Sequence, residues 1–193
     1  MNAVGTTTIG VSIAVPEPYG QFLQERRAGF GDPAAGAIPT HVTLLPPTEV
    51  RREELPGFGR HLAAVAERGR PFGMRLDGTD TFRPVSPVVY VRVAEGAAAC
   101  AELQEAVRSG PVAREIQFPY HPHVTVAHGI AEAAMDRAQA ELAGFTAHWT
   151  AAGFALYEQG EDQVWRPLRV FPFGSEGRPA LPHQHSRRAT SPL

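Results

Sequence analysis

His41-Val42-Thr43 and His123-Val124-Thr125 are two copies of one tripeptide, and each copy lies in an apolar stretch of the chain. The longer stretches read Pro39-Thr40-His41-Val42-Thr43-Leu44-Leu45-Pro46-Pro47 and Tyr120-His121-Pro122-His123-Val124-Thr125-Val126-Ala127. Val and Thr favour extended backbone, so each copy predicts a strand. Because successive side chains of a strand point to opposite faces, the His and the Thr of one copy share a face, roughly 6.5–7 Å apart at Cα.

The elements around the two copies follow the same order along the chain. In the first half, the periodicity of apolar residues predicts a strand at 9–15, a helix at 19–28, a strand at 40–45 that Pro46-Pro47 closes, a helix near 55–65 and a strand from 72. In the second half it predicts a strand at 88–93, a helix near 100–107, strands at 123–127 and 154–157 around a helix at 131–142, and one more strand at 164–171. This duplication of element order favours an α/β or α+β architecture over a helical bundle or a β-sandwich.

Composition limits the classes of function. The chain has 193 residues, 43% of them hydrophobic and 20% charged, which is ordinary for a globular protein. All its basic residues are Arg, so catalysis through a lysine Schiff base and a P-loop lysine are both excluded. A net charge of −2 argues against broad binding of long nucleic acid, while Arg side chains can still bind a few phosphates. Cys100 is the lone cysteine, which excludes an intrachain disulfide.

The folded part is expected to end before the C-terminus. We predict one bilobal domain over residues 1–173 and a disordered tail over 174–193, where Pro, Ser, His and Arg dominate without apolar periodicity. The first fifteen residues lack the basic region of a signal peptide, and no apolar run has the length of a membrane span. The expected location is the cytoplasm.

Two imidazoles and two hydroxyls lining one cleft would suit phosphoryl transfer. One His can take a proton from the attacking oxygen while the other gives a proton to the leaving oxygen, since the pKa of imidazole lies near working pH. The hydroxyls of Thr43 and Thr125 can donate to the phosphate oxygens as charge builds there. A single His-x-Thr tripeptide is weak evidence, because roughly half a match is expected by chance. Two copies in corresponding elements favour catalysis over two structural histidines.

These two motifs resemble the paired motifs of the two-histidine phosphoesterases, a superfamily that contains LigT-like bacterial 2′-5′ RNA ligases and cyclic nucleotide phosphodiesterases. The resemblance extends from about Thr8 to Phe173. It implies an α+β, bilobal fold in which two antiparallel sheets with outer helices surround a central cleft. It also implies metal-independent cleavage of 2′,3′-cyclic phosphates or related phosphodiesters, with no cofactor and with a nucleotide or short RNA as partner.

The resemblance also implies roles for the four motif residues. His41 would be the proton donor, His123 the proton acceptor, and Thr43 and Thr125 the phosphate-binding residues. LigT-type members commonly carry an Arg shortly after the second motif, whereas Ala127-His128-Gly129 occupies that place here.

Three further residues are candidates for the rim of a substrate site, namely His121, Tyr120 and His128. His121 would share a face with His123 if the strand extends that far, and Tyr120 could stack on a base. Two alternatives remain at this stage. The first is a non-catalytic member of the fold that binds RNA ends or nucleotides. The second is a metallohydrolase that uses His121, His123 and His128, although their spacing lacks the nearby Asp or Glu that hard-metal hydrolase sites usually add. No metal site and no obligate protein partner are predicted.

Overall fold

A computed structural model describes residues 5–112 and 114–174 of the chain. Its elements, in chain order, are β1 (Thr6–Ala14), α1 (Tyr19–Gly29), η1 (Pro33–Gly36), β2 (His41–Arg51), η2 (Arg52–Glu54), α2 (Leu55–Arg68), β3 (Phe72–Thr81), β4 (Val88–Glu95), α3 (Ala97–Arg108), β5 (His123–His128), α4 (Glu132–Glu141), β6 (Thr146–Ala151), β7 (Gly153–Gln159) and β8 (Trp165–Pro172). The predicted α+β class with two antiparallel sheets and outer helices is confirmed.

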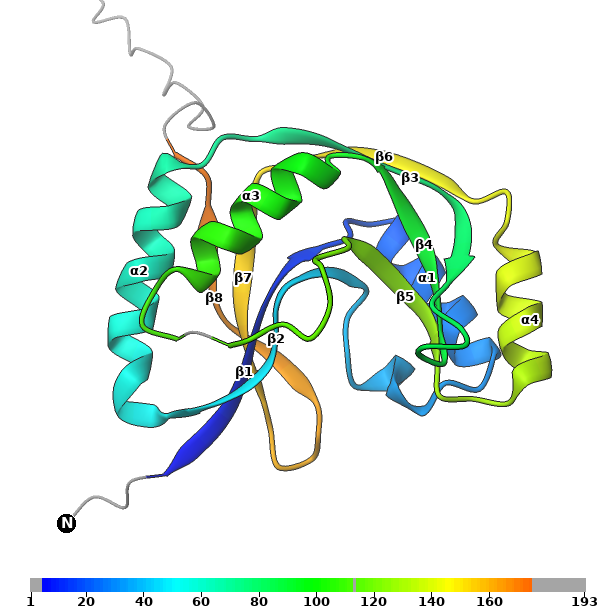
Figure 1. Ribbon diagram of the computed structural model, residues 1–193, viewed down its shortest axis with the longest axis horizontal. Coiled ribbons are helices and arrows are strands. Elements are labelled where there is room, and N and C mark those ends of the chain that lie inside the picture. The colour runs from blue at the N-terminus through cyan, green and yellow to red at the C-terminus, as the bar shows by residue number, and fades with distance from the viewer. Residues whose placement is uncertain (1–4, 113, 175–193) are drawn as a thin grey trace, which may run out of the picture.

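The two sheets contain four strands each and have the same plan. Sheet A has the order β2-β1-β7-β8, and sheet B has the order β5-β4-β3-β6. The His-Val-Thr strand is the edge strand in both, so β2 and β5 hold equivalent positions. Figure 1 shows β3 leaving the first half of the chain to run beside β4 and β6, while β7 returns from the second half to lie beside β1. The third strand of each sheet therefore comes from the other half of the chain.

The helices are exchanged in the same way. α1 follows β1 in sequence but contacts β5, and α3 follows β4 but contacts β2. The remaining two helices complete the layers, since α2 contacts α3 and β8, and α4 contacts β3, β4 and β5. Figure 1 accordingly shows α2 and α3 on one side of the molecule and α1 and α4 on the other. Each sheet thus carries one helix from each half of the chain.

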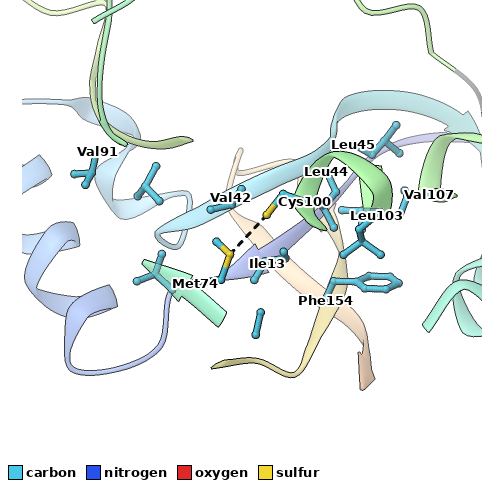
Figure 2. Close-up of a cluster of buried hydrophobic side chains, with 14 of the residues drawn as sticks. Ile13, Val42, Leu44, Leu45, Met74, Val91, Cys100, Leu103, Val107 and Phe154 are labelled. Atoms are coloured by element: carbon cyan, nitrogen blue, oxygen red, sulfur yellow. Dashed lines mark hydrogen bonds between the residues drawn. The ribbon is translucent and has the colours of Figure 1, made fainter. Parts of the chain in front are cut away.

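The core is continuous between the halves. Phe58, Leu62 and Val65 recur at helical spacing and are buried on one face of α2, as the sequence pattern predicts. At the centre of the core, the thiol of Cys100 on α3 lies 3.7 Å from the sulfur of Met74 on β3. Figure 2 shows this contact among buried side chains of β1, β2, α3 and β7. One hydrophobic cluster therefore joins both sheets.

One predicted boundary is wrong, and one strand was missed. β2 does not close at Pro46-Pro47 but continues to Arg51, because a proline can sit in an edge strand and the register with β1 shifts there, between Leu45 and Thr48. The strand β6 was not predicted at all. Its inward-facing residues include the small Ala147 and Ala151, which give only a weak apolar alternation.

The folded body extends to the end of the described residues. The N–H of Gly174 donates to the Ala66 carbonyl over 3.1 Å. The tail predicted from 174 onward otherwise lies outside the described residues, and the domain boundary at 173 stays a prediction. None of the helices in residues 5–112 and 114–174 is long and apolar enough to cross a membrane.

Candidate active site

The two motif histidines lie at the first position of equivalent edge strands, and their rings are held in the same way. His41 Nδ1 lies 2.6 Å from the Pro39 carbonyl oxygen, and His123 Nδ1 lies 2.7 Å from the His121 carbonyl oxygen. A carbonyl only accepts, so in each neutral ring Nδ1 carries the hydrogen and Nε2 keeps its lone pair. Both rings therefore offer the same nitrogen, Nε2, for proton transfer.

Both motif strands line one cavity of about 370 Å³. All four predicted residues line it, namely His41, Thr43, His123 and Thr125. Its other lining residues are Gly10, Val11, Ser12, Arg27, Ile38, Pro39, Leu45, Pro47, Val88, His128, Tyr157 and Trp165. Strand pairing places some of these residues beside the motif strands. Ser12 of β1 pairs with Thr43 of β2, and Val88 of β4 pairs with His128 of β5. The cavity can hold a group of phosphate size between polar side chains of both halves.

Burial lowers the pKa of both imidazoles and so favours their neutral form. Desolvation lowers the pKa of His41 below its ordinary value, the hydrogen bond to Pro39 partly opposes this, and the Arg27 guanidinium lowers the pKa further. Desolvation likewise lowers the pKa of His123, the hydrogen bond to the His121 carbonyl partly opposes this, and the His121 and His41 imidazoles both lower the pKa further. Charge on one ring thus disfavours charge on the other, which makes the singly protonated pair a distinct state.

Arg27 is a cavity residue that sequence reasoning missed. It lies in the last turn of α1 and is only 4% exposed. Its Nε donates to Asp32 Oδ2 over 2.7 Å, and the backbone N–H of His128 donates to the same oxygen over 3.0 Å. Sequence spacing did not suggest this site, because the pairing of residues 27, 32 and 128 arises only when α1 packs against β5. Trp165 was missed for the same reason: it lies on the distant strand β8, and its backbone N–H donates to the Ala37 carbonyl.

The three predicted rim residues lie in different environments. His128 lines the cavity, whereas Tyr120 and His121 do not. The Tyr120 hydroxyl donates to the Thr43 carbonyl over 2.8 Å, and burial raises its pKa. β5 begins at His123 and does not extend to His121, so the two rings do not share a strand face; the His121 ring instead packs edge-on to Phe82.

The positions of His121, His123 and His128 test the metallohydrolase alternative. Within residues 5–112 and 114–174, no three His, Cys, Asp or Glu side chains converge in the way that metal ligands do. His128 and His123 lie at opposite ends of β5, and the His121 ring centroid is 6.4 Å from that of His123. The proposed triad of His121, His123 and His128 is therefore not assembled.

Comparisons with known proteins agree with this architecture. A family model described as the 2′-5′ RNA ligase superfamily matches residues 15–163. A protein of Halalkalibacterium halodurans named "Putative phosphoesterase" is 30% identical over 121 residues, which are 63% of this chain and 70% of that protein. A protein of the same description from Bacillus cytotoxicus is 28% identical over 159 residues, or 80% of this chain and 92% of that one.

Solved structures show the same fold. Escherichia coli LigT in complex with 3′-AMP superimposes with a TM-score of 0.60 at 19% identity, over 89% of this chain and all of LigT (100%). A protein of Thermus thermophilus superimposes with a TM-score of 0.61 at 24% identity, over 88% of this chain and 99% of its own.

Proposed function

The chain belongs to the 2′-5′ RNA ligase superfamily, and from that membership we propose that it is a metal-independent phosphodiesterase acting on 2′,3′-cyclic phosphates or related nucleotide and RNA phosphodiesters. The resemblance to two-histidine phosphoesterases is confirmed, and relatives named as phosphoesterases support that general activity. The substrate and the direction of reaction are part of the proposal. Support for a nucleotide substrate comes from LigT, which has been crystallised with 3′-AMP, ATP and NADP⁺.

One observation carries the proposal. His41 and His123 line a single cavity, and each ring uses Nδ1 for a backbone carbonyl and keeps Nε2 for chemistry. Acid–base catalysis of a displacement at phosphorus needs two such nitrogens, one protonated and one neutral. Because the His41 imidazole lowers the pKa of His123, protonation of both rings at once is disfavoured.

In the proposed reaction, a water molecule attacks phosphorus while His123 Nε2 accepts its proton. The bond from phosphorus to the leaving oxygen breaks, and His41 Nε2 donates a proton to that oxygen. The products are a phosphomonoester and an alcohol, which for a cyclic phosphate are parts of one molecule. Thr43 and Thr125 donate hydrogen bonds to the non-bridging oxygens, where negative charge increases in the transition state.

The test is a screen of purified protein against 2′,3′-cyclic nucleotides, 2′-5′-linked dinucleotides and RNA ending in a cyclic phosphate, with and without EDTA. We expect turnover that EDTA does not change. His41→Ala and His123→Ala should each lower kcat by a factor of about 10²–10⁴, the usual contribution of a proton-transfer group. His148→Ala is the matched control, because His148 is exposed on β6 and lies outside the cavity.

A substrate with a good leaving group, such as a nitrophenyl phosphodiester, separates the two roles. Such a leaving group needs no proton, so His41→Ala should regain activity and His123→Ala should not. Rescue of His123→Ala instead would reverse the roles, and near-normal activity in either single variant would eliminate the two-histidine mechanism. Nucleotide binding without any turnover would favour the non-catalytic alternative.

A further inference from the structure

The cavity has a single fixed positive charge among its described lining residues. Arg27 is the one Arg or Lys side chain in that set, and no Asp or Glu side chain of the described residues joins it. A guanidinium stays protonated at any pH at which the protein is folded. An anion that enters the cavity therefore meets one permanent cation, and that cation lies close enough to His41 to lower the pKa of its imidazole.

Asp32 holds the Arg27 guanidinium by one edge. Oδ2 of this carboxylate accepts from Arg27 Nε and from the His128 backbone N–H, and Oδ1 accepts from the Ala34 N–H. The Asp32 side chain is 1% exposed, and the Arg27 side chain is 5% exposed. Because Asp32 is held by two backbone donors from different segments, the direction of the guanidinium is set by the tertiary structure.

The other edge of the guanidinium carries the two Nη nitrogens. Among residues 5–112 and 114–174, the hydrogen bond that the Arg27 guanidinium forms is the one from Nε to Asp32, and Nη1 and Nη2 form none. In the same residues, every side-chain nitrogen or oxygen that is fully buried has a hydrogen-bond partner. Both Nη atoms must therefore keep some contact with solvent, and the cavity that Arg27 lines is where a side chain so deeply buried can find it.

We propose that Arg27 is a phosphate-binding residue of this cavity, with Nη1 and Nη2 donating to two oxygens of the phosphate. The identification of that phosphate as the reacting one rests on the proposed function. Paired N–H donors match the spacing of phosphate oxygens, and hydrogen bonds between charged groups are stronger than neutral ones. A buried ion pair adds little net stability by itself, so stability alone does not explain a charged pair at this position.

The test is calorimetric titration of the full-length protein with inorganic phosphate at constant ionic strength. Arg27→Met should weaken phosphate binding by a factor of about 10–100, the range expected for hydrogen bonds to a charged group. Arg26→Met is the matched control, because Arg26 is the preceding residue of α1 and its half-exposed guanidinium pairs with Glu141 outside the cavity. Its phosphate affinity should stay within about twofold of the wild type.

Two further variants distinguish weaker phosphate binding from misfolding. Arg27→Met leaves the Asp32 carboxylate buried without its partner, which is costly, so the double variant Arg27→Met/Asp32→Asn removes both charges. Arg27→Lys keeps the charge and the pairing with Asp32 but loses the planar pair of donors, so it should fold and still bind phosphate more weakly. Thermal melts show which variants are folded under the conditions of the titration.

The outcomes separate this inference from the proposed activity, because phosphate binding requires no turnover. Weak binding in the folded Arg27 variants and normal binding in Arg26→Met support the role of Arg27, even where no phosphodiester is cleaved. Wild-type affinity in any folded Arg27 variant overturns it, even where phosphodiesters are cleaved. Failure of the wild-type protein to bind phosphate overturns it as well.

Discussion

Two backbone carbonyls determine which nitrogen each catalytic candidate offers. The carbonyl oxygens of Pro39 and His121 each lie two residues before the His whose Nδ1 they bind. This local hydrogen bond removes one of the two neutral tautomers and directs Nε2 away from the backbone. At the scale of single residues, the duplication is therefore visible in the tautomer of the two rings as well as in the sequence.

The lowered pKa values of the pair predict an acidic optimum for the free enzyme. Burial moves the pKa of both His41 and His123 below the ordinary value of about 6.5. A pair with both pKa values lowered is most often singly protonated at a pH below about 6.5, and it becomes fully neutral as the pH rises. The profile of kcat/KM against pH should therefore be bell-shaped with its maximum below about pH 6.5.

The profile of kcat should lie at higher pH than that of kcat/KM. A bound phosphodiester anion stabilises the imidazolium form and raises both pKa values in the complex. Steady-state kinetics over about pH 4–9 with a substrate that does not titrate there measures both profiles. A kcat/KM maximum well above neutral pH, or a profile with one limb, would contradict the assignment of both histidines to the reaction.

At the scale of elements, the open edge of β2 is covered by the segment that precedes β5. β2 pairs with β1 on one side only, which leaves outward carbonyl groups on the other. Tyr120 donates to the Thr43 carbonyl and Arg114 donates to the Pro47 carbonyl. The segment thus satisfies edge groups that would otherwise be open to another chain. It also joins the motif strand of one half to the motif strand of the other.

Removal of the Tyr120 hydroxyl tests whether the segment before β5 protects the edge of β2. Tyr120→Phe should lower the free energy of unfolding by about 1 kcal/mol, because it removes one hydrogen bond and leaves a carbonyl without its donor. Amide exchange in β2 should accelerate, since part of its edge becomes free to open. Tyr19→Phe is the control, because Tyr19 packs against the core and no hydrogen bond of its hydroxyl is seen in the described structure. Urea denaturation and amide exchange give the two measurements, and equal effects of both variants would contradict a specific role for Tyr120.

At the scale of the whole molecule, strands that pair with the other half of the chain make the two halves interdependent. β3 belongs to the first half but pairs with β4 and β6, and β7 belongs to the second half but pairs with β1. The candidate site depends on both halves in the same way. Its two motif strands belong to different sheets, and its Arg27 lies on α1, which contacts β5 of sheet B.

Met74 lies at the centre of this shared core and gives a test of interdependence. Met74→Ala should lower the free energy of unfolding by about 2–5 kcal/mol, because it removes a buried side chain that contacts Cys100 across the two halves. Both sheets should still unfold in one transition, as followed by circular dichroism and Trp fluorescence. Val85→Ala is the control, since Val85 is 74% exposed and its truncation should cost less than about 0.5 kcal/mol. Two separate transitions in the Met74 variant would show that the halves fold independently.

The sequence by itself determined the features that depend on short-range periodicity. Alternation around the two His-Val-Thr copies located both motif strands, and the order of elements revealed the duplication. These features follow from the backbone geometry of a single strand or helix, in which each side chain's direction depends on its near neighbours. For this reason the four motif residues of the cavity could be predicted without knowledge of any tertiary contact.

Only the tertiary structure decided the remainder of the site. The oxygen of Asp32 that binds Arg27 also binds the backbone of His128, which is 96 residues away. Tyr120 was expected near a substrate, yet its hydroxyl binds a carbonyl of the edge strand 77 residues before it. β6 and the continuation of β2 past Pro46 likewise depend on which strands lie beside them. Such contacts form because the exchanged strands and helices pack both halves around one core, and local sequence periodicity carries no information about that packing.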